Sequence, residues 1–294
     1  MKIQNLTIVT SFFCIWLSGY FSQQTQLVSA FILVFSFGIL HGANDLAILN
    51  KMQEKTVLMS NFKLLFYYLV TILATVCLFY FVPSFGLLFF VLLSAYHFGE
   101  QHWHSKLESP LKIIRWFELI YGSFILFLLF QFHFVEVKQV VFEITNFSIT
   151  KFYNQLIFYV LTGLLLITSL YLANKSEKFK NFLLLEVFYL IIFALIFKIT
   201  TLLWGFAIYF IFWHSIPSLV EQITFLYGNW STSNFISYCR SALGYWFVSI
   251  LGISLLYYFL DEKKLFEALF FSFLAAITFP HVLVMLLMFQ KKNV

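Results

Sequence analysis

Charged side chains are too scarce in this sequence to cover a water-soluble protein. Only 11% of the 294 residues are charged, and 62% are hydrophobic. A soluble domain carries roughly 25% charged residues. Lipid must therefore be the solvent for most of the surface. We expect an all-α, polytopic integral membrane protein.

Apolar stretches long enough to cross a bilayer recur along the whole chain. A spanning helix needs about 20 mostly apolar residues. On this basis the sequence predicts a single transmembrane catalytic domain over residues 1–294, a bundle of about ten helices. The predicted spans are 5–21, 27–49, 62–82, 85–103, 112–133, 152–174, 181–198, 201–224, 236–260 and 264–289.

The distribution of positive charge supports this topology. If both termini are cytoplasmic, the inside segments hold Lys and Arg residues such as Lys51, Lys106 and Arg115, thirteen of the eighteen in the chain. Cytoplasmic loops of membrane proteins carry such an excess. The net charge of +5 therefore reflects membrane orientation, and we expect no nucleic-acid partner.

Four of the seven histidines fall at a common depth in the predicted bundle. His41, His97, His214 and His281 lie on the second, fourth, eighth and tenth spans, which all run from outside to inside. Each follows the outer end of its span by about 12 to 17 residues, or roughly 18–26 Å at the rise of an α-helix. The four side chains thus share one band, displaced toward the cytoplasmic face.

Histidines at this depth require a reason, because ionisable groups inside a bilayer are costly and mark function or specific pairing. Neutral imidazoles suit iron, zinc or copper. The alternative is that each histidine only hydrogen-bonds across a helix interface. Four of them in one band favour a metal site.

Two carboxylates accompany these histidines. Asp45 follows His41 by one helical turn, and Glu100 follows His97 by three residues. Asp45 could ligate the metal or accept a hydrogen bond that fixes an imidazole tautomer, and Glu100 is a candidate for orienting a histidine in the same way. For Asp45, a cap or an interfacial position near a helix end is the alternative. Pro217 and Pro280, beside His214 and His281, predict irregular backbone at two of the four histidines.

Four short motifs carry a resemblance to a known family. They are His-Gly-x-x-Asp at 41–45, Tyr-His-Phe-Gly-Glu at 96–100, Trp-His-Ser at 213–215 and Pro-His at 280–281. In order and spacing they resemble the Brp/Blh family of membrane β-carotene 15,15′-dioxygenases, over essentially the whole chain. Two positions depart from the family pattern: Ser218 replaces a histidine found in many members, and His102 replaces a residue that is often acidic.

The resemblance implies an activity that composition alone does not show. Members cleave β-carotene at its central double bond with O2, and the retinal formed supplies a microbial rhodopsin. It implies Fe(2+) as the cofactor and His41, His97, His214 and His281 as its ligands, in a bacterial inner membrane. Asp45 and Glu100 would each orient a histidine. The residues expected to contact the polyene are Tyr96, Phe98, Tyr209 and Trp213.

Other classes of membrane protein fit less well. Di-iron desaturases and hydroxylases use dense histidine boxes, and none occurs among these seven histidines. A transporter with a histidine-lined path would need more buried polar residues, and no inverted repeat is visible. A rhodopsin needs a lysine near the middle of a span, whereas Lys198 lies at a helix end.

Overall fold

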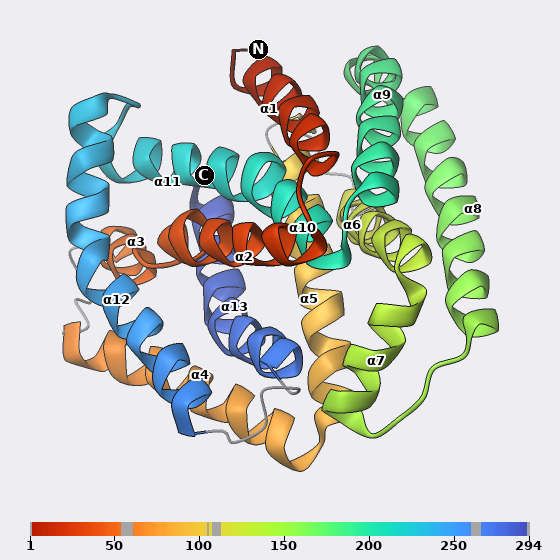
Figure 1. Ribbon diagram of the computed structural model, residues 1–294. Helices are drawn as coiled ribbons and strands as arrows, with labels where there is room; N and C mark the ends of the chain where they lie inside the picture. Colours follow the sequence, from red (N-terminus) through yellow and green to blue (C-terminus); the bar gives the residue numbers. More distant parts are fainter. Residues whose placement is uncertain (1, 54–60, 105, 108–112, 260–265, 293–294) are drawn as a thin grey trace. The chain divides into compact units, whose positions relative to one another are not determined.

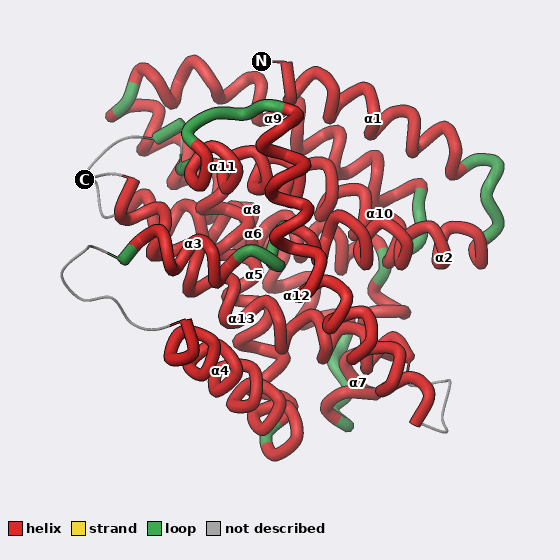
Figure 2. The backbone as a smooth tube through the Cα atoms, turned by 90° about the vertical axis from the view of Figure 1, so that its left-hand side faces the viewer, coloured by secondary structure: helices red, strands yellow, loops and turns green. Residues whose placement is uncertain are grey.

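The computed structural model describes residues 2–53, 61–104, 106–107, 113–259 and 266–292, and every regular element in these ranges is helical (Figures 1 and 2). An all-α fold is therefore confirmed for this part of the chain. The α-helices are α1 (Lys2–Ser18), α2 (Gln23–Leu33), α3 (Asp45–Met52), α4 (Asn61–Phe81), α5 (Pro83–Trp103), α6 (Ile113–Phe132), α7 (Phe134–Thr145), α8 (Lys151–Lys175), α9 (Glu177–Ile199), α10 (Leu202–Ile208), α11 (Ile216–Tyr227), α12 (Thr232–Phe259) and α13 (Phe266–Lys292). Two π-helical turns, η1 (Val34–Gly38) and η2 (Tyr209–Ser215), interrupt this series.

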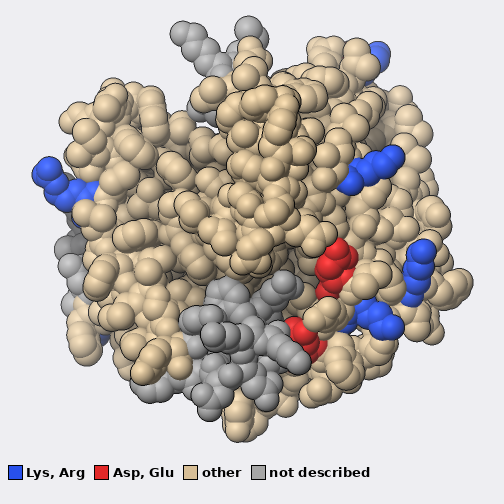
Figure 3. Space-filling view, viewed as in Figure 1, with Lys and Arg blue, Asp and Glu red and all other residues tan. Residues whose placement is uncertain are grey.

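Six helices within the described ranges are long and apolar enough to cross a membrane. Side chains of the helices with least burial, such as Leu73 and Val160, are exposed in the isolated protein, as expected for surfaces that face lipid. The face drawn in Figure 3 likewise carries few charged side chains. The six are Phe62–Phe81, Ile113–Phe132, Lys151–Lys175, Glu177–Ile199, Leu202–Tyr227 and Leu269–Lys291.

The sequence predicted about ten spans, and four of them are not among these six. The spans at 5–21, 85–103 and 236–260 correspond to the helices α1, α5 and α12, and their crossing of the membrane stays a prediction, as does the cytoplasmic location of both termini. The fourth, 27–49, is wrong as a continuous helix. There α2 gives way to η1, and the chain turns at residues 41–44 before α3 begins.

The described chain divides into two compact units, each assembled from separate segments. The prediction of a single domain stays a prediction. The first unit contains residues 1–32, 91–142 and 146–214, and the second contains residues 33–90, 143–145 and 215–294.

In the first unit, α6 packs along α8 and α9, and α9 also packs against α1 and α10 (Figure 1). Indole N–H groups join α1 to the segment that contains η2. Trp204 donates to Ser18 Oγ at 2.8 Å, and Trp213 donates to Ser11 Oγ at 2.9 Å. These buried bonds fix the segment that ends at His214.

Two glycines let α5 and α6 approach until their backbones touch. A Cβ atom on Gly99 would overlap the Glu118 carbonyl group, and one on Gly122 would overlap the carbonyl of Ala95. Such small residues allow close helix packing in membranes, where association depends on van der Waals contact. The crossing lies next to His97, so it sets the position of that histidine's helix.

In the second unit, α13 packs against α3 and α4, and α11 packs against α3 and α12. Its core is an apolar cluster in which Ile48 of α3 meets Met285, Met288 and Phe289 of α13. The contact between these two helices brings the two histidine-bearing segments of this unit together.

Candidate metal centre

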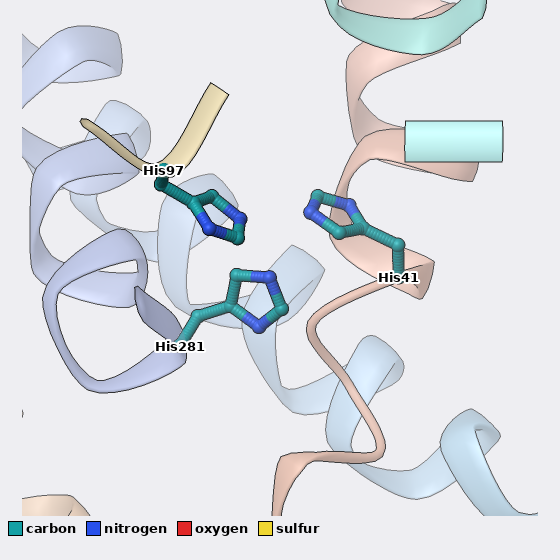
Figure 4. A group of neighbouring side chains, drawn as sticks. All are labelled: His41, His97 and His281. Carbon is teal, nitrogen blue, oxygen red and sulfur yellow. The ribbon is translucent and has the colours of Figure 1, made fainter. Parts of the chain in front are cut away.

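His41 and His281 form a pair inside the second unit. His41 lies in the turn between η1 and α3, and His281 lies on α13 directly after Pro280. Their ring centroids are 4.7 Å apart with the rings edge to face (Figure 4). A ring nitrogen of each lies within 4.8 Å of one from the other. Both side chains are at most 5% exposed.

Hydrogen bonds fix which nitrogen of each ring carries the proton. His41 Nδ1 lies 2.5 Å from the Gly38 carbonyl oxygen, and His281 Nδ1 lies 2.8 Å from Asp45 Oδ1. A carbonyl or carboxylate oxygen only accepts, so Nδ1 must be the donor in each ring. The Nε2 atoms of the neutral rings therefore carry the lone pairs that a metal requires.

Asp45 hydrogen-bonds to His281 and not to His41, the histidine that the sequence predicted as its partner. Spacing along one helix paired it with His41, but the turn at 41–44 breaks that helix and Asp45 contacts His281 of α13 instead. Its second oxygen accepts from the Tyr68 hydroxyl of α4 at 2.9 Å. Asp45 is 1% exposed, and it begins α3, so it is the first residue of a helix rather than a surface cap. An imidazole held by a carboxylate in this way is oriented and made a better donor.

Replacing Asp45 with asparagine is expected to weaken metal binding by about 10- to 100-fold, the usual cost of losing such a partner. The amide still fits the space, but it cannot accept from Tyr68 and His281 as a charged carboxylate does. Iron titration of the purified variant measures the change. Tyr68→Phe, which keeps the carboxylate, is the control and is expected to bind iron more tightly than Asp45→Asn. Equal affinity of Asp45→Asn and wild type would contradict this role.

The turn that carries His41 is held by α12. The Asn44 side chain donates to the Tyr238 carbonyl at 2.9 Å and accepts from Ser241 Oγ at 2.7 Å. The Tyr238 hydroxyl lies 3.2 Å from the His41 carbonyl oxygen and 2.6 Å from Gln222 Oε1. Non-helical backbone at membrane depth is tolerated where protein groups satisfy it in this way.

His97 and His214 form the second pair, inside the first unit. His97 lies on α5 (Figure 4 also draws it) and His214 lies in η2. Their ring centroids are 4.6 Å apart at an angle of 78°, and each residue is 1% exposed. The π-helical turn at His214 agrees with the irregular backbone predicted from Pro217, which has no N–H for the carbonyl of Trp213. Such turns are frequent at functional sites.

Two phenylalanine rings pack against His214. Phe98 has its ring centroid 4.6 Å from that of His214, and Phe210 stacks on the same imidazole at 5.6 Å. Phe98 was predicted as a substrate contact, and that role stays a prediction, whereas the contact of Phe210 with His214 was not predicted. The signal was present, because Phe210 precedes His214 by one helical turn.

The other predicted site residues lie in the first unit with varied partners. Glu100 accepts from the Tyr96 hydroxyl at 3.1 Å. The Tyr209 ring packs on Phe98 at 5.6 Å between centroids. The Trp213 ring packs on Phe193, and its indole N–H donates to Ser11 of α1. Tyr209 is thus one ring removed from His214, and the proposed roles of all four residues stay predictions.

Both residues that depart from the family pattern have polar side-chain partners. Ser218, in the second unit, is fully buried and accepts from Gln222 Nε2 at 3.1 Å. In the first unit, His102 Nε2 lies 2.7 Å from Glu186 Oε2 of α9. The position that is often acidic in the family is thus a histidine here, and a carboxylate from another helix contacts it.

Buried imidazoles, with helices apolar enough to cross a bilayer, define a helical membrane protein whose histidine pairs are suited to a metal. The model of the family described as beta-carotene 15,15′-dioxygenase matches residues 32–289, and the chain belongs to this family. All four paired histidines fall inside the match. No curated protein and no solved structure gives a significant match.

Proposed function

We propose that this protein is an iron-dependent dioxygenase that cleaves β-carotene at its 15,15′ double bond to give two molecules of retinal. The observation that carries the proposal is that all four histidines are buried within the region that the family model matches, with the tautomers of His41 and His281 fixed by hydrogen bonds. In the proposal, His41, His281, His97 and His214 supply the ligands.

The donor set fits iron. Non-haem Fe(II) accepts imidazole nitrogen, and histidine ligands are normally oriented by a hydrogen bond at their other nitrogen. His41 and His281 both have that bond. Asp45, buried against His281, would supply negative charge to offset the ion.

Iron held there would supply the activation of O2 beside the double bond. A dioxygenase leaves one oxygen atom in each aldehyde, so no external reductant is consumed. The residues of this chain contribute position and exclusion of water. Phe98 and Phe210 cover His214 with apolar rings, which suit a polyene without polar groups. Asp45 and the Gly38 carbonyl hold two imidazoles in one orientation.

Expression in a β-carotene-accumulating bacterium tests the reaction. The wild-type chain is expected to bleach the cells and form retinal, as measured by chromatography, and His97→Ala is expected to form none. Labelled O2 should appear in both aldehydes. Undiminished β-carotene beside folded, iron-loaded protein would refute the proposal and favour a transporter or another oxygenase.

Iron content tests whether the two pairs act together. One iron per chain is expected if all four histidines serve one ion, and two irons per chain would show that each pair binds its own. The resemblance to the Brp/Blh family extends the proposal to a bacterial inner membrane and to supply of retinal to a rhodopsin. Co-expression with an opsin, read by pigment formation, tests that supply.

A further inference from the structure

Outside the histidine pairs, the first unit buries a second group of ionisable side chains. Lys106 follows the end of α5, and its Nζ lies 2.6 Å from Glu186 Oε1 and 2.8 Å from His102 Nε2. His102 Nε2 lies 2.7 Å from Glu186 Oε2. The Tyr121 hydroxyl of α6 donates to Glu186 Oε2 at 3.1 Å. An amine, an imidazole and a carboxylate are thus all in mutual hydrogen-bonding contact.

The imidazole nitrogen in this group has two alternative roles. His102 Nε2 can accept a proton from the Lys106 ammonium, or, once protonated, it can donate to Glu186. Lys106 and Glu186 both contact His102 Nε2. A proton that leaves Lys106 therefore passes to an imidazole that already lies against the Glu186 carboxylate. The arrangement can therefore produce a neutral amine without releasing a charge into the protein interior.

Aromatic rings enclose the amine. Lys106 Nζ lies 5.1 Å from the ring centroid of Trp103 and 5.8 Å from that of Tyr189. Trp103 is itself 1% exposed and stacks on Phe179. Burial lowers the pKa of Lys106, and the neighbouring Glu186 carboxylate partly opposes this effect. The surroundings favour an apolar, conjugated partner for the lysine.

A nucleophile, a base within hydrogen-bonding distance and a third group that orients the base are the signature of covalent catalysis or covalent binding. For a lysine, the matching electrophile is a carbonyl carbon, and the product is a Schiff base. We propose that Lys106 binds an apolar conjugated aldehyde as a reversible Schiff base, with His102 as its base and Glu186 as its counter-ion. The proposal rests on the proposed function for its ligand, because carotene cleavage yields such an aldehyde.

The chemistry balances without another reactant. His102 takes one proton from the Lys106 ammonium, and the free amine attacks the aldehyde carbon. One proton of the attached amine moves to the carbonyl oxygen, which becomes a hydroxyl. The proton on His102 then goes to this hydroxyl, which leaves as water, and a C=N bond replaces C=O. When the imine nitrogen is protonated, Glu186 offsets its charge. Hydrolysis by the reverse path releases the aldehyde.

Reductive trapping with added retinal tests this site without requiring carotene cleavage. Full-length protein in detergent is incubated with retinal in the dark, reduced with borohydride and mapped by mass spectrometry. Lys180 of α9 is the matched control, because it also faces a carboxylate, Glu177 at 3.7 Å, but is 62% exposed. We expect the retinyl adduct on Lys106 at about tenfold or more the level on Lys180, given the activation by an adjacent base.

Two variants test whether Lys106 forms an imine or only makes a structural ion pair with Glu186. Lys106→Arg keeps the charge beside Glu186 but forms no imine, and it should lose the adduct at this position. His102→Gln keeps a hydrogen-bonding side chain but removes the base, and it should slow adduct formation by about 100-fold. A purely structural group would leave that rate unchanged in His102→Gln.

The outcomes distinguish this inference from the proposed function. An adduct on Lys106 in the His97→Ala variant, which is expected to be inactive in cleavage, supports the aldehyde site by itself. Labelling of Lys180 at or above the level of Lys106 in wild-type protein would overturn the inference, even if carotene cleavage is demonstrated. This comparison uses only the wild-type chain, so it stands if a variant fails to fold.

Discussion

Gly122→Ala is expected to prevent the chain from accumulating as a folded membrane protein. The added methyl group would overlap the Ala95 carbonyl of α5, which is backbone and cannot rotate away. Overpacking in a core costs typically 1–3 kcal/mol even where side chains can adjust, and here whole helices must separate. Yield of monodisperse protein and its melting temperature in detergent measure the effect.

Gly163→Ala on α8 is the matched control, since a Cβ there meets nothing within 4 Å. Alanine is favoured over glycine inside a helix by about 1 kcal/mol, so this variant should be at least as stable as wild type. A Gly122→Ala protein that melts with the wild type would show that α5 and α6 do not depend on this close crossing.

His281→Ala is expected to lose both bound iron and retinal formation. It removes one imidazole donor of the proposed centre and leaves Asp45 buried without that partner. Loss of the carboxylate partner alone costs about 10- to 100-fold in metal affinity, so loss of the ligand should cost more. Iron analysis of the purified variant, with chromatography of retinal, gives the two readings.

His133→Ala provides the comparison for a buried histidine with a structural role. Its Nε2 donates to the Phe197 carbonyl at 2.7 Å, so the variant should lose stability, by about 1–3 kcal/mol for an unsatisfied buried group, but keep its iron. If His133→Ala loses iron as completely as His281→Ala, the assignment of ligands is wrong.

The sequence predicted most reliably those structural features that depend on a single segment of the chain. Long apolar stretches identified the six helices that the structure confirms as membrane-compatible, and four histidines at one depth identified the residues that the structure places in two buried pairs. Pro217 indicated the irregular backbone that became η2. These properties depend on local composition and spacing.

The sequence failed where two distant segments meet. Asp45 and His281 are 236 positions apart, so helical spacing assigned the carboxylate to the wrong histidine. The partner of Lys106 is 80 positions away on α9, and nothing local to either residue indicates the contact. The turn at His41 was missed because its stabilising groups, Tyr238 and Ser241, belong to α12.

The hydrogen bonds from Trp204 and Trp213 to α1 show that the first folding unit extends beyond the region that the family model matches. The match begins at residue 32, yet Ser11 and Ser18 accept the N–H groups of Trp213 and Trp204. A chimera that grafts only the shared region onto another leader helix would leave both indoles without their acceptors, and the first of them adjoins His214. Residues outside the family match thus help to hold the segment that ends at His214, so Ser11 and Ser18 limit which helices could replace α1.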